Sequence, residues 1–305
     1  MSIARAAEIL RSGGLVVFPT ETVYGLGADA ANPRAVARIY EAKGRPQFNP
    51  LIAHVSGLAE AEQHAHLHEN ARKLAQAFWP GPFTIVARRR SESPVAELAC
   101  AGLDTIALRA PSHPMARELL AAFGGPIVAP SANRSGHVSA TTAQHAAEDL
   151  GDRVDLVLDG GPCQIGLEST IVAVGDDGAV TLLRPGAISR REIEAIVGPI
   201  SLAHGGKVQA PGMLESHYAP RARIRLDAAA PQPGEAYLAF GASAPAGGAT
   251  LSAAGDLVEA AANLYAALRT LDATGAEVIA VAPIPPRGLG EAIRDRLARA
   301  AAPRS

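Results

Sequence analysis

Short apolar runs alternate with amphipathic helical patterns over about the first 198 residues of this chain. Such alternation is typical of an α/β domain built around a largely buried sheet. The first strand is expected at LVVF (15–18), and a helix is expected to begin at Asn32-Pro33, where an Asn cap precedes Pro at the first helical position. Further strands are expected at 51–55, 83–88, 104–109, 126–130, 154–158, 169–174 and 180–184. Further helices are expected at 56–65, 69–78, 112–123, 141–150 and 189–197.

The alternation stops where a segment rich in Gly and Pro carries few periodic apolar residues. We interpret the chain as a first domain at 1–198, a linker at 199–221 and a small C-terminal α/β domain at 222–305. In that second domain RIRL, EAYLAF and EVIAVA are expected as strands. Helices are expected near 255–271 and 286–301, and a loop at 244–255.

Charge and cysteine content narrow the possible functions. The chain has 28 Lys and Arg against 30 Asp and Glu, so no overall positive field exists to hold a nucleic acid. Its two cysteines, Cys100 and Cys163, lie far apart, which argues against a disulfide framework or a cysteine-ligated zinc. The N-terminal residues read as a charged amphipathic helix, not a signal peptide, and no apolar run approaches the length of a membrane span. We therefore expect a cytoplasmic protein that binds neither membrane nor DNA.

Two polar motifs lie beside the first strands. PTETVYGLG (19–27) follows the strand at 15–18, and its hydroxyls and glycines suit a polar ligand at a strand end, although a Thr-capped turn is the simpler interpretation. KGRPQFNPLIAH (43–54) places Lys43 and Arg45 at a helix end, where two cations can grip a triphosphate or simply complement the helix dipole. His54 lies in the following strand, where a buried histidine is usually just a hydrogen-bonded core residue.

Two arginines on strands are further candidate anion ligands. In DTIALRAP (104–111) the strand period puts Thr105 and Arg109 on one face, and an arginine on a central strand demands an anion. A ligand carboxylate, a phosphate or a structural Asp or Glu would satisfy Arg109 equally well. Arg184 precedes a proline at the end of another strand and is a candidate phosphate ligand.

A loop of small polar residues follows the strand at 126–130. APSANRSG (129–136) and Ser139 supply hydroxyl, amide and backbone donors that can bind an anion or a nucleobase, although an ordinary Ser/Asn-rich connection is the simpler interpretation. The loop contains no lysine, so it is not a Walker-type phosphate loop.

Two other patterns are assigned structural roles. His64, His66 and His68 alternate where a helix end and a loop are expected, so they do not share a face as metal ligands would. Arg88 to Arg90 are interpreted as a charged strand end that contacts RNA only under an alternative hypothesis.

Six motifs follow one another over about 170 residues: PTETVYGLG, KGRPQFNPL, WPGPFT, LRAPSHP, PSANRSG and LESTIV. In this order they closely resemble the YrdC-like family. The Lys43/Arg45 and Ser131/Asn133 pairs resemble its KxR and SxN signatures, and RPGAIS at 184–189 extends the match. HYAP (217–220) and the second domain resemble the longer, two-domain form. The resemblance implies a twisted mixed-sheet YrdC-like catalytic domain followed by a small Rossmann-like domain.

The activity that the resemblance implies is nucleotidyl transfer. Such an enzyme makes threonylcarbamoyl-AMP and pyrophosphate from L-threonine, bicarbonate and ATP, assisted by Mg²⁺, and a partner transferase then passes the threonylcarbamoyl group to tRNA. By the same resemblance, L-threonine is expected at Thr22, His54, Arg109, Ala129 and Ser169. ATP is expected at Lys43, Arg45, Asn49, Thr105, Ser131, Asn133, Ser139, Arg184 and Tyr218. Lys43 and Arg45 are the expected catalytic residues, which neutralise phosphate charge, and no metal ligands are assigned.

Two alternatives belong to other classes. An RNA-binding module is disfavoured by the near-neutral charge and by 4% aromatic residues, which leave little for base stacking. A carbamoyl-transfer domain of the hydrogenase-maturation type is disfavoured because the chain lacks zinc-finger cysteines and an acylphosphatase-like segment.

Overall fold

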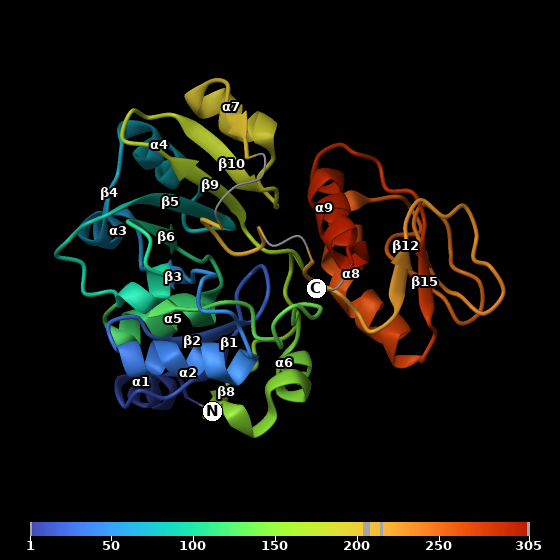
Figure 1. The fold of residues 1–305 in the computed structure, drawn as a ribbon, viewed down its shortest axis with the longest axis horizontal. Coiled ribbons are helices and arrows are strands. Elements are labelled where there is room, and N and C mark those ends of the chain that lie inside the picture. The colour runs from blue at the N-terminus through green and yellow to red at the C-terminus, as the bar shows by residue number, and fades with distance from the viewer. Residues whose placement is uncertain (1, 204–207, 214–215, 304–305) are drawn as a thin grey trace.

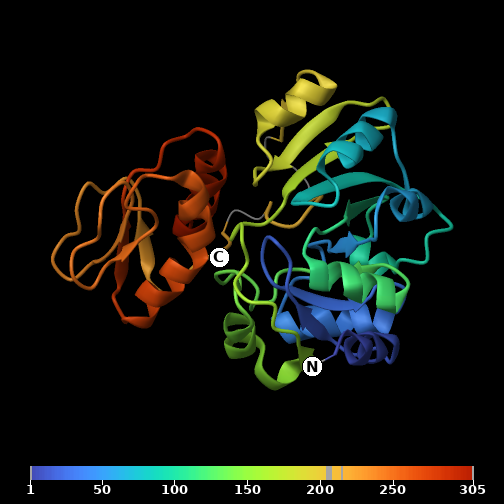
Figure 2. The same cartoon turned by 180° about the vertical axis from the view of Figure 1, so that it is seen from behind.

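The computed structural model describes residues 2–203, 208–213 and 216–303. An N-terminal domain carries a large twisted sheet, and a smaller C-terminal domain carries a second sheet (Figure 1). Helices α8 (Leu257–Ala273) and α9 (Leu289–Ala301) of the smaller domain lie between its own sheet and the N-terminal domain, as Figure 2 shows from behind. The expected fold class, a mixed α/β domain followed by a small α/β domain, is confirmed.

The large sheet has the strand order β11-β10-β9-β5-β6-β3-β7-β2-β1-β8, and β4 pairs with β5 outside that path. Each strand that the sequence predicts in this domain is present within a few residues. The strands are β1 (Val16–Phe18), β2 (Gly25–Asp29), β3 (Ile52–His54), β4 (Ala65–His66), β5 (Phe83–Arg89), β6 (Thr105–Arg109), β7 (Ile127–Val128), β8 (Leu156–Val157), β9 (Thr170–Val174), β10 (Val180–Arg184) and β11 (Ser201–Leu202).

The prediction of a turn at Gly25 and Gly27 is wrong, because both residues belong to β2, which pairs antiparallel with β1. Two glycines remove the side chains that would reveal a strand periodicity. Their absence also lets the ring of Phe18 lie against the strand, since a Cβ at Gly27 would come within 2.8 Å of that ring.

The register at the centre of the sheet brings distant motifs together. β3 runs parallel to β6 with His54 opposite Arg109, and it runs antiparallel to β7 with His54 opposite Ile127. β5 connects β6 to β9, antiparallel to the former and parallel to the latter. As a result, the ends of β3 and β6 and the start of β9 meet on one side of the domain.

Helices cover the sheet and agree closely with the sequence prediction. They are α1 (Ile3–Arg11), α2 (Pro33–Lys43), α3 (Leu58–His64), α4 (Glu69–Phe78), α5 (Pro114–Phe123), α6 (Ala143–Leu150) and α7 (Arg190–Val197), with 3₁₀ turns at Glu97–Cys100 and Gly151–Arg153. Asn32 caps α2 as expected, since its side chain accepts the N–H groups of Arg34 and Ala35. The helix ends at Gly44, whose φ of 59° is left-handed.

Apolar side chains alternate between the two faces of the sheet. On β1, Val17 packs into the cluster that includes α2 and α4, whereas Val16 and Phe18 pack into the cluster with α1 and α5. Burial of both faces explains why the strands read as continuous apolar runs in the sequence.

The C-terminal sheet is entirely parallel and has the order β12-β15-β13-β14. Its strands are β12 (Arg223–Arg225), β13 (Ala236–Ala239), β14 (Ala249–Thr250) and β15 (Val278–Val281). The loop expected at 244–255 contains β14, which the sequence analysis missed because two residues are too few to show a period.

The segment expected as a linker starts within the large sheet, because Ser201 and Leu202 form β11 and pair with β10. Residues 204–207 and 214–215 of this segment lie outside the described part of the chain. The described linker residues contact both domains. Ala210 packs with Ile52 and Val86 of the N-terminal domain, whereas Tyr218, which is 1% exposed, stacks on Tyr265 of the C-terminal domain.

The two domains are in close contact at Gly166. Its φ is 72°, and a Cβ built there would lie 2.6 Å from the backbone of Ala261 and Ala262 in α8. Only glycine fits this contact without moving the helix.

Gly166→Ala is therefore expected to destabilise the protein by roughly 2–4 kcal/mol, combining the cost of a positive φ with steric overlap between the domains. Gly161→Ala is the matched control, because Gly161 has a similar φ of 78° and a Cβ added there would meet nothing within 4 Å. Urea unfolding should show a loss of only about 1 kcal/mol for the control. Equal losses for both variants would show that the domain contact contributes nothing.

Candidate active site

One pocket lies where the N-terminal domain and the linker meet. Its walls come from the segment after β1, from the ends of β3 and β6, from the loop after β7 and from the linker. Seven of the residues predicted for the site line it: Arg45, His54, Arg109, Ala129, Ser131, Arg184 and Tyr218. Residues up to 173 positions apart in the sequence thus share one concave surface.

Arg109 finds its anion inside the protein. Its Nη2 lies 2.5 Å from Oε1 of Glu21, and both side chains are almost fully buried. The other carboxylate oxygen of Glu21 accepts the backbone N–H of Ser112. Burial opposes ionisation of Glu21, but the charge of Arg109 and these hydrogen bonds outweigh it and lower the pKa of the carboxyl. Of the partners left open by the sequence, a structural glutamate is therefore present.

His54 lies beside this pair and is neutral. Burial, and then the positive charge of Arg109, lower the pKa of its imidazole to about 3. Its Nδ1 is buried and has no hydrogen-bond partner among the described residues. A buried imidazole nitrogen without a partner is uncommon in a core and is typical of a site that a ligand completes.

Thr22 belongs to a turn that precedes β2. Its hydroxyl lies 2.8 Å from that of Thr20, whose own Oγ1 donates to the carbonyl of Val23. Thr20 and Val23 line the pocket, and Thr22 is buried directly beside them. Thr22 can therefore belong to the turn that the sequence predicts and also lie close enough to the pocket to contact a ligand.

The two cations of the KxR pair have different surroundings. Lys43 is buried, and its Nζ donates to the backbone carbonyls of Ser131 and Asn133. Arg45 reaches the pocket and donates to the carbonyls of Asn49 and Pro50. Burial lowers the pKa of Arg45 to about 10, which leaves it charged at neutral pH. In this structure Lys43 therefore holds the Ser/Asn loop, whereas Arg45 faces the pocket.

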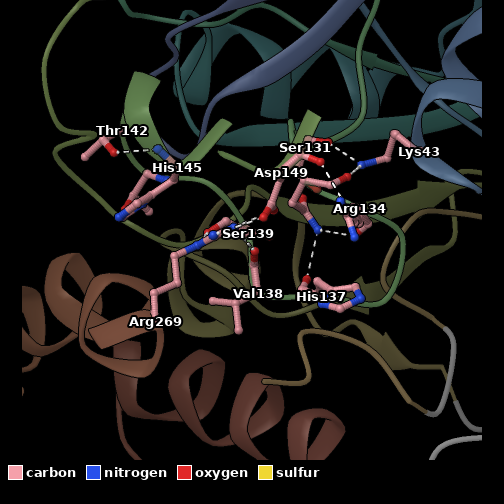
Figure 3. Close-up of polar contacts among 12 residues, drawn as sticks. Lys43, Ser131, Arg134, His137, Val138, Ser139, Thr142, His145, Asp149 and Arg269 are labelled. Carbon is pink, nitrogen blue, oxygen red and sulfur yellow. Dashed lines mark hydrogen bonds and ion pairs between the residues drawn. The ribbon is translucent and has the colours of Figure 1, made fainter. Parts of the chain in front are cut away.

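The loop from Ser131 to Ser139 is held by hydrogen bonds, among them those from Lys43 to Ser131 and from Arg269 to Val138 and Ser139 (Figure 3). The amide of Asn133 donates to the carbonyls of Arg134 and His137, while its Oδ1 is buried and has no partner in the described part of the chain. Ser139 is buried, and its hydroxyl donates to Glu168 at 2.5 Å. This loop is consequently a rigid wall of the pocket.

Arg184 is held at the opposite wall. It donates to both the carbonyl and the hydroxyl of Ser169, and its Nη1 donates to the carbonyl of Pro211 in the linker. The hydroxyl of Ser169 also lies 2.7 Å from that of Thr84 on β5. A candidate phosphate ligand and a candidate threonine ligand therefore touch each other.

The linker closes the pocket with His217 and Tyr218. Tyr218 has a φ of 63°, which non-glycine residues rarely adopt, and its buried hydroxyl has no partner among the described residues. Its ring stacks on Tyr265 of α8 at 5.7 Å. Burial lowers the pKa of His217 to about 3, and its Nδ1 also lacks a partner within the described ranges.

Five predicted ATP ligands do not line the pocket: Lys43, Asn49, Thr105, Asn133 and Ser139. Asn49 is fully buried, with both amide atoms unpaired among the described residues, so it is available to a ligand that enters from the side of Arg45. Thr105 begins β6 opposite Arg88, four residues or about 13 Å along the strand from Arg109. The structure does not bring Thr105 to the pocket.

The patterns assigned structural roles have structural partners. His64 ends α3 and contacts Ser93, and His68 caps α4. Arg88 pairs with Asp176, and Arg90 donates to the carbonyl of Glu62. Within residues 2–203, 208–213 and 216–303, no group of three acidic, His or Cys side chains is placed to bind a metal.

Sequence reasoning missed three polar residues of the site. Glu21 and Glu168 are paired with arginines 88 and 128 positions away, so no local pattern reveals them. His217 stands in the HYAP motif, yet only its tyrosine neighbour is assigned to the site.

No described helix combines the length and apolar character needed to cross a membrane.

The fold and the pocket together define a YrdC-like enzyme. A family model described as "Telomere recombination" matches residues 8–186, and a model of the threonylcarbamoyl-AMP synthase C-terminal domain matches residues 188–302. The chain is 40% identical to the threonylcarbamoyl-AMP synthases of Bacillus subtilis and Pyrococcus abyssi, over 98% and 97% of its length and 92% of each relative. This chain belongs to the two-domain threonylcarbamoyl-AMP synthase family.

Solved structures support the same relationship. The structure of P. abyssi Sua5 complexed with L-threonine superimposes with a TM-score of 0.91 at 38% identity, covering 98% of this chain and 94% of that one. Full-length HypF in the phosphate- and nucleotide-bound form matches 60% of this chain and 28% of its own at 21% identity and a TM-score of 0.53, so it shares the fold alone.

Acid is expected to weaken the fold through the buried carboxyls. The pKa of Glu168 is lowered to about 2 because its arginine partners and hydrogen bonds outweigh the opposing effect of burial, and the pKa of Glu21 is lowered as well. The unfolded chain takes up these protons near their ordinary pKa, so the stabilisation is complete above about pH 5 and is lost as the pH falls toward 2. Each pH unit by which folding lowers the pKa of a carboxyl corresponds to about 1.4 kcal/mol of folding stability.

The measurement is the free energy of urea unfolding between about pH 7 and pH 3. The double variant Glu21→Gln/Arg109→Gln retains only Glu168 of the two carboxyls and should show a shallower decline than the unmodified protein. A flat profile for the unmodified protein would contradict the prediction.

Proposed function

We propose that this chain makes threonylcarbamoyl-AMP and pyrophosphate from L-threonine, bicarbonate and ATP, as a nucleotidyltransferase for tRNA modification. The main supporting observation is that one pocket of a threonylcarbamoyl-AMP synthase family member gathers Arg109 and His54 on one side and Arg45 and Arg184 on the other. A site for an amino acid carboxylate beside a site for phosphates is what this reaction requires.

The threonine side of the site is proposed at Thr22, His54, Arg109, Ala129 and Ser169. A guanidinium has five N–H donors, and the contacts of Arg109 with Glu21 and Gly81 use two of them. A threonine carboxylate can therefore approach Arg109 without breaking the pair with Glu21.

The ATP side is proposed around Lys43, Arg45 and Arg184, with Asn49, Ser131, Asn133, Ser139 and Tyr218 as further contacts. Thr105 is left out because it begins β6 away from the pocket. Support comes from the buried polar atoms of Asn49, Asn133 and Tyr218 that have no partner in the described residues. Unpaired buried donors and acceptors are costly, and a bound nucleotide would satisfy them.

The proposed reaction has two bond-forming steps. The threonine ammonium first loses a proton to give the free amine. The amine then attacks the carbon of bicarbonate, releasing water, or of CO₂, releasing a proton, to form a carbamate. A carbamate oxygen then attacks the α-phosphorus of ATP in line, and pyrophosphate leaves with the electron pair of the broken P–O bond. Positioning and charge neutralisation by Lys43, Arg45 and Arg184 supply most of the acceleration.

Magnesium does not fit a site made by the described residues alone. Both oxygens of Glu168 are occupied by Arg296, Tyr265 and Ser139, and Glu21 is held by Arg109 and Ser112. We therefore propose that Mg²⁺ enters as the counter-ion of the ATP phosphates, and no step is assigned to a protein-bound metal.

We further propose that residues 1–198 carry the reaction, that residues 199–221 close over it and that 222–305 form the second domain. The product would pass in the cytoplasm to a partner transferase that acts on tRNA, so contact with tRNA is indirect. The near-neutral charge of the chain agrees with indirect contact, because direct binding of tRNA favours a positively charged surface.

Release of pyrophosphate from ATP is expected to depend on L-threonine and bicarbonate. Purified protein with Mg²⁺ should release pyrophosphate faster with L-threonine than with L-serine, and only at background level without an amino acid. A folded protein that releases none under these conditions would contradict the proposed function and favour RNA binding or carbamoyl transfer.

The two sides of the pocket should be separable by substitution. Arg109→Ala, made together with Glu21→Gln so that no buried carboxylate loses its partner, is expected to raise the KM for threonine by tenfold or more and that for ATP by less than about threefold. Arg45→Ala should show the opposite pattern. Steady-state kinetics with one substrate varied at a time measures both, and equal losses for both ligands would refute the assignment.

A further inference from the structure

Glu168 lies at the junction of the pocket and the C-terminal domain. It belongs to the N-terminal domain, precedes Ser169 and lines the pocket, yet its side chain is only 7% exposed. The family resemblance assigns it no role in binding threonine or ATP.

The C-terminal domain supplies most of the partners of this carboxylate. Nε of Arg296 on α9 lies 2.8 Å from Oε2, and the hydroxyl of Tyr265 on α8 lies 2.8 Å from Oε2 and 3.1 Å from Oε1. From the N-terminal domain, Ser139 donates to Oε1 at 2.5 Å. The carboxylate thus joins two helices of the C-terminal domain to the loop from Ser131 to Ser139 of the N-terminal domain.

Arg296 is the most deeply buried cation of the molecule's described part. Its side chain is 1% exposed, it lies 5.3 Å from the ring centre of Tyr218, and its Nη2 donates to the carbonyl of Pro185. A charge buried so completely requires a paired anion, and Glu168 is the buried one.

Arg184 is a second cation that faces Glu168. Both residues line the same pocket. Burial raises the pKa of Glu168, but the positive charges of Arg296 and then of Arg184 lower it. Among the described residues, Arg184 donates to Ser169 and Pro211 and not to this carboxylate. Arg296 therefore engages a carboxylate whose charge also acts on Arg184, a candidate phosphate ligand.

We propose that Arg296 is a positioning residue of the active site, which neutralises Glu168 and so keeps Arg184 available to the phosphates of ATP. This inference rests on the proposed function of the pocket. Without Arg296, the carboxylate of Glu168 pairs with Arg184 and repels the incoming triphosphate. The C-terminal domain thereby contributes to nucleotide binding without touching the nucleotide.

A second contact from α8 supports the same role of the C-terminal domain. Arg269 donates to the carbonyls of Val138 and Ser139, and its guanidinium pairs with Asp149 at 2.7 Å (Figure 3). Ser139 is thus held from one side through its carbonyl by Arg269 and from the other through its hydroxyl by Glu168. Docking of the C-terminal domain therefore helps to fix the conformation of the loop from Ser131 to Ser139.

The test is direct titration of ATP and Mg²⁺ by calorimetry in the absence of threonine, with the full chain. Arg296→Met should raise the dissociation constant of ATP tenfold or more, whereas the KM for threonine at saturating ATP changes by less than about threefold. Adding Glu168→Gln to Arg296→Met should restore ATP affinity to within about threefold of the unmodified protein, because a neutral amide does not neutralise Arg184.

Arg299→Met is the matched control. It removes the same charge and the same length of side chain from the same helix, but the side chain of Arg299 pairs with Asp295, whereas Arg296 is the arginine of α9 that binds Glu168. Its ATP affinity should equal that of the unmodified protein. Tyr265→Phe is the milder companion variant, since it removes one donor to Glu168 and should weaken ATP binding about threefold.

The proposal is overturned if Arg296→Met and Tyr265→Phe both bind ATP normally, or if Glu168→Gln fails to restore binding in a double variant whose melting temperature is normal. If Arg296→Met does not fold, normal ATP binding by Tyr265→Phe is enough to overturn the proposal. Unmodified protein that binds ATP but releases no threonine-dependent pyrophosphate would refute the proposed function, while the ATP titrations would still test the role of Arg296.

Discussion

Burial of positive charge is the constraint on which this structure depends. The buried Lys and Arg side chains of the described residues are Lys43, Arg45, Arg109, Arg184 and Arg296, and all five surround one pocket or its rear wall. An isolated buried cation is far too costly to persist, so each must be compensated by carboxylates or carbonyls. Two buried glutamates and a set of backbone carbonyls provide this compensation. The folded protein thus holds cations ready for an anionic substrate before it arrives, which is the electrostatic preorganisation that phosphoryl chemistry uses.

The arginines of the pocket differ in how firmly their partners hold them. Arg109 is locked by a glutamate, whereas Arg45 and Arg184 are held by neutral carbonyls that a phosphate can outcompete. One of these carbonyls belongs to the linker, and the buried tyrosine of the linker stacks on the C-terminal domain. The proposed nucleotide side of the pocket is therefore bounded by the N-terminal domain and by a linker that packs on the C-terminal domain. Through that linker the second domain can influence the reaction proposed for the first.

Much of the fold was predictable because its signals are local. The helix at Pro33–Lys43 was marked by an Asn cap and a Pro, and the strands buried on both faces appeared as continuous apolar runs. Four short strands escaped prediction for physical reasons: β2 contains glycines in place of the alternating side chains, and β4, β11 and β14 have two residues each. The order of strands also lay beyond local signals, since it results from pairings such as that of Ile52–His54 with Ala107–Arg109.

By itself, the sequence determined the α/β class, the placement of most helices and strands, and the motifs that identify the family, because these depend on neighbouring residues and on residue types in a given order. It also showed that Arg109 needs an anion. Only the tertiary structure decided which anion, since Glu21 lies 88 residues away and meets Arg109 through the packing of β6 against the turn after β1. In the same way, the pairing of Glu168 with Arg296 follows from the docking of one domain on another, and the energy of a buried charge depends on its three-dimensional surroundings.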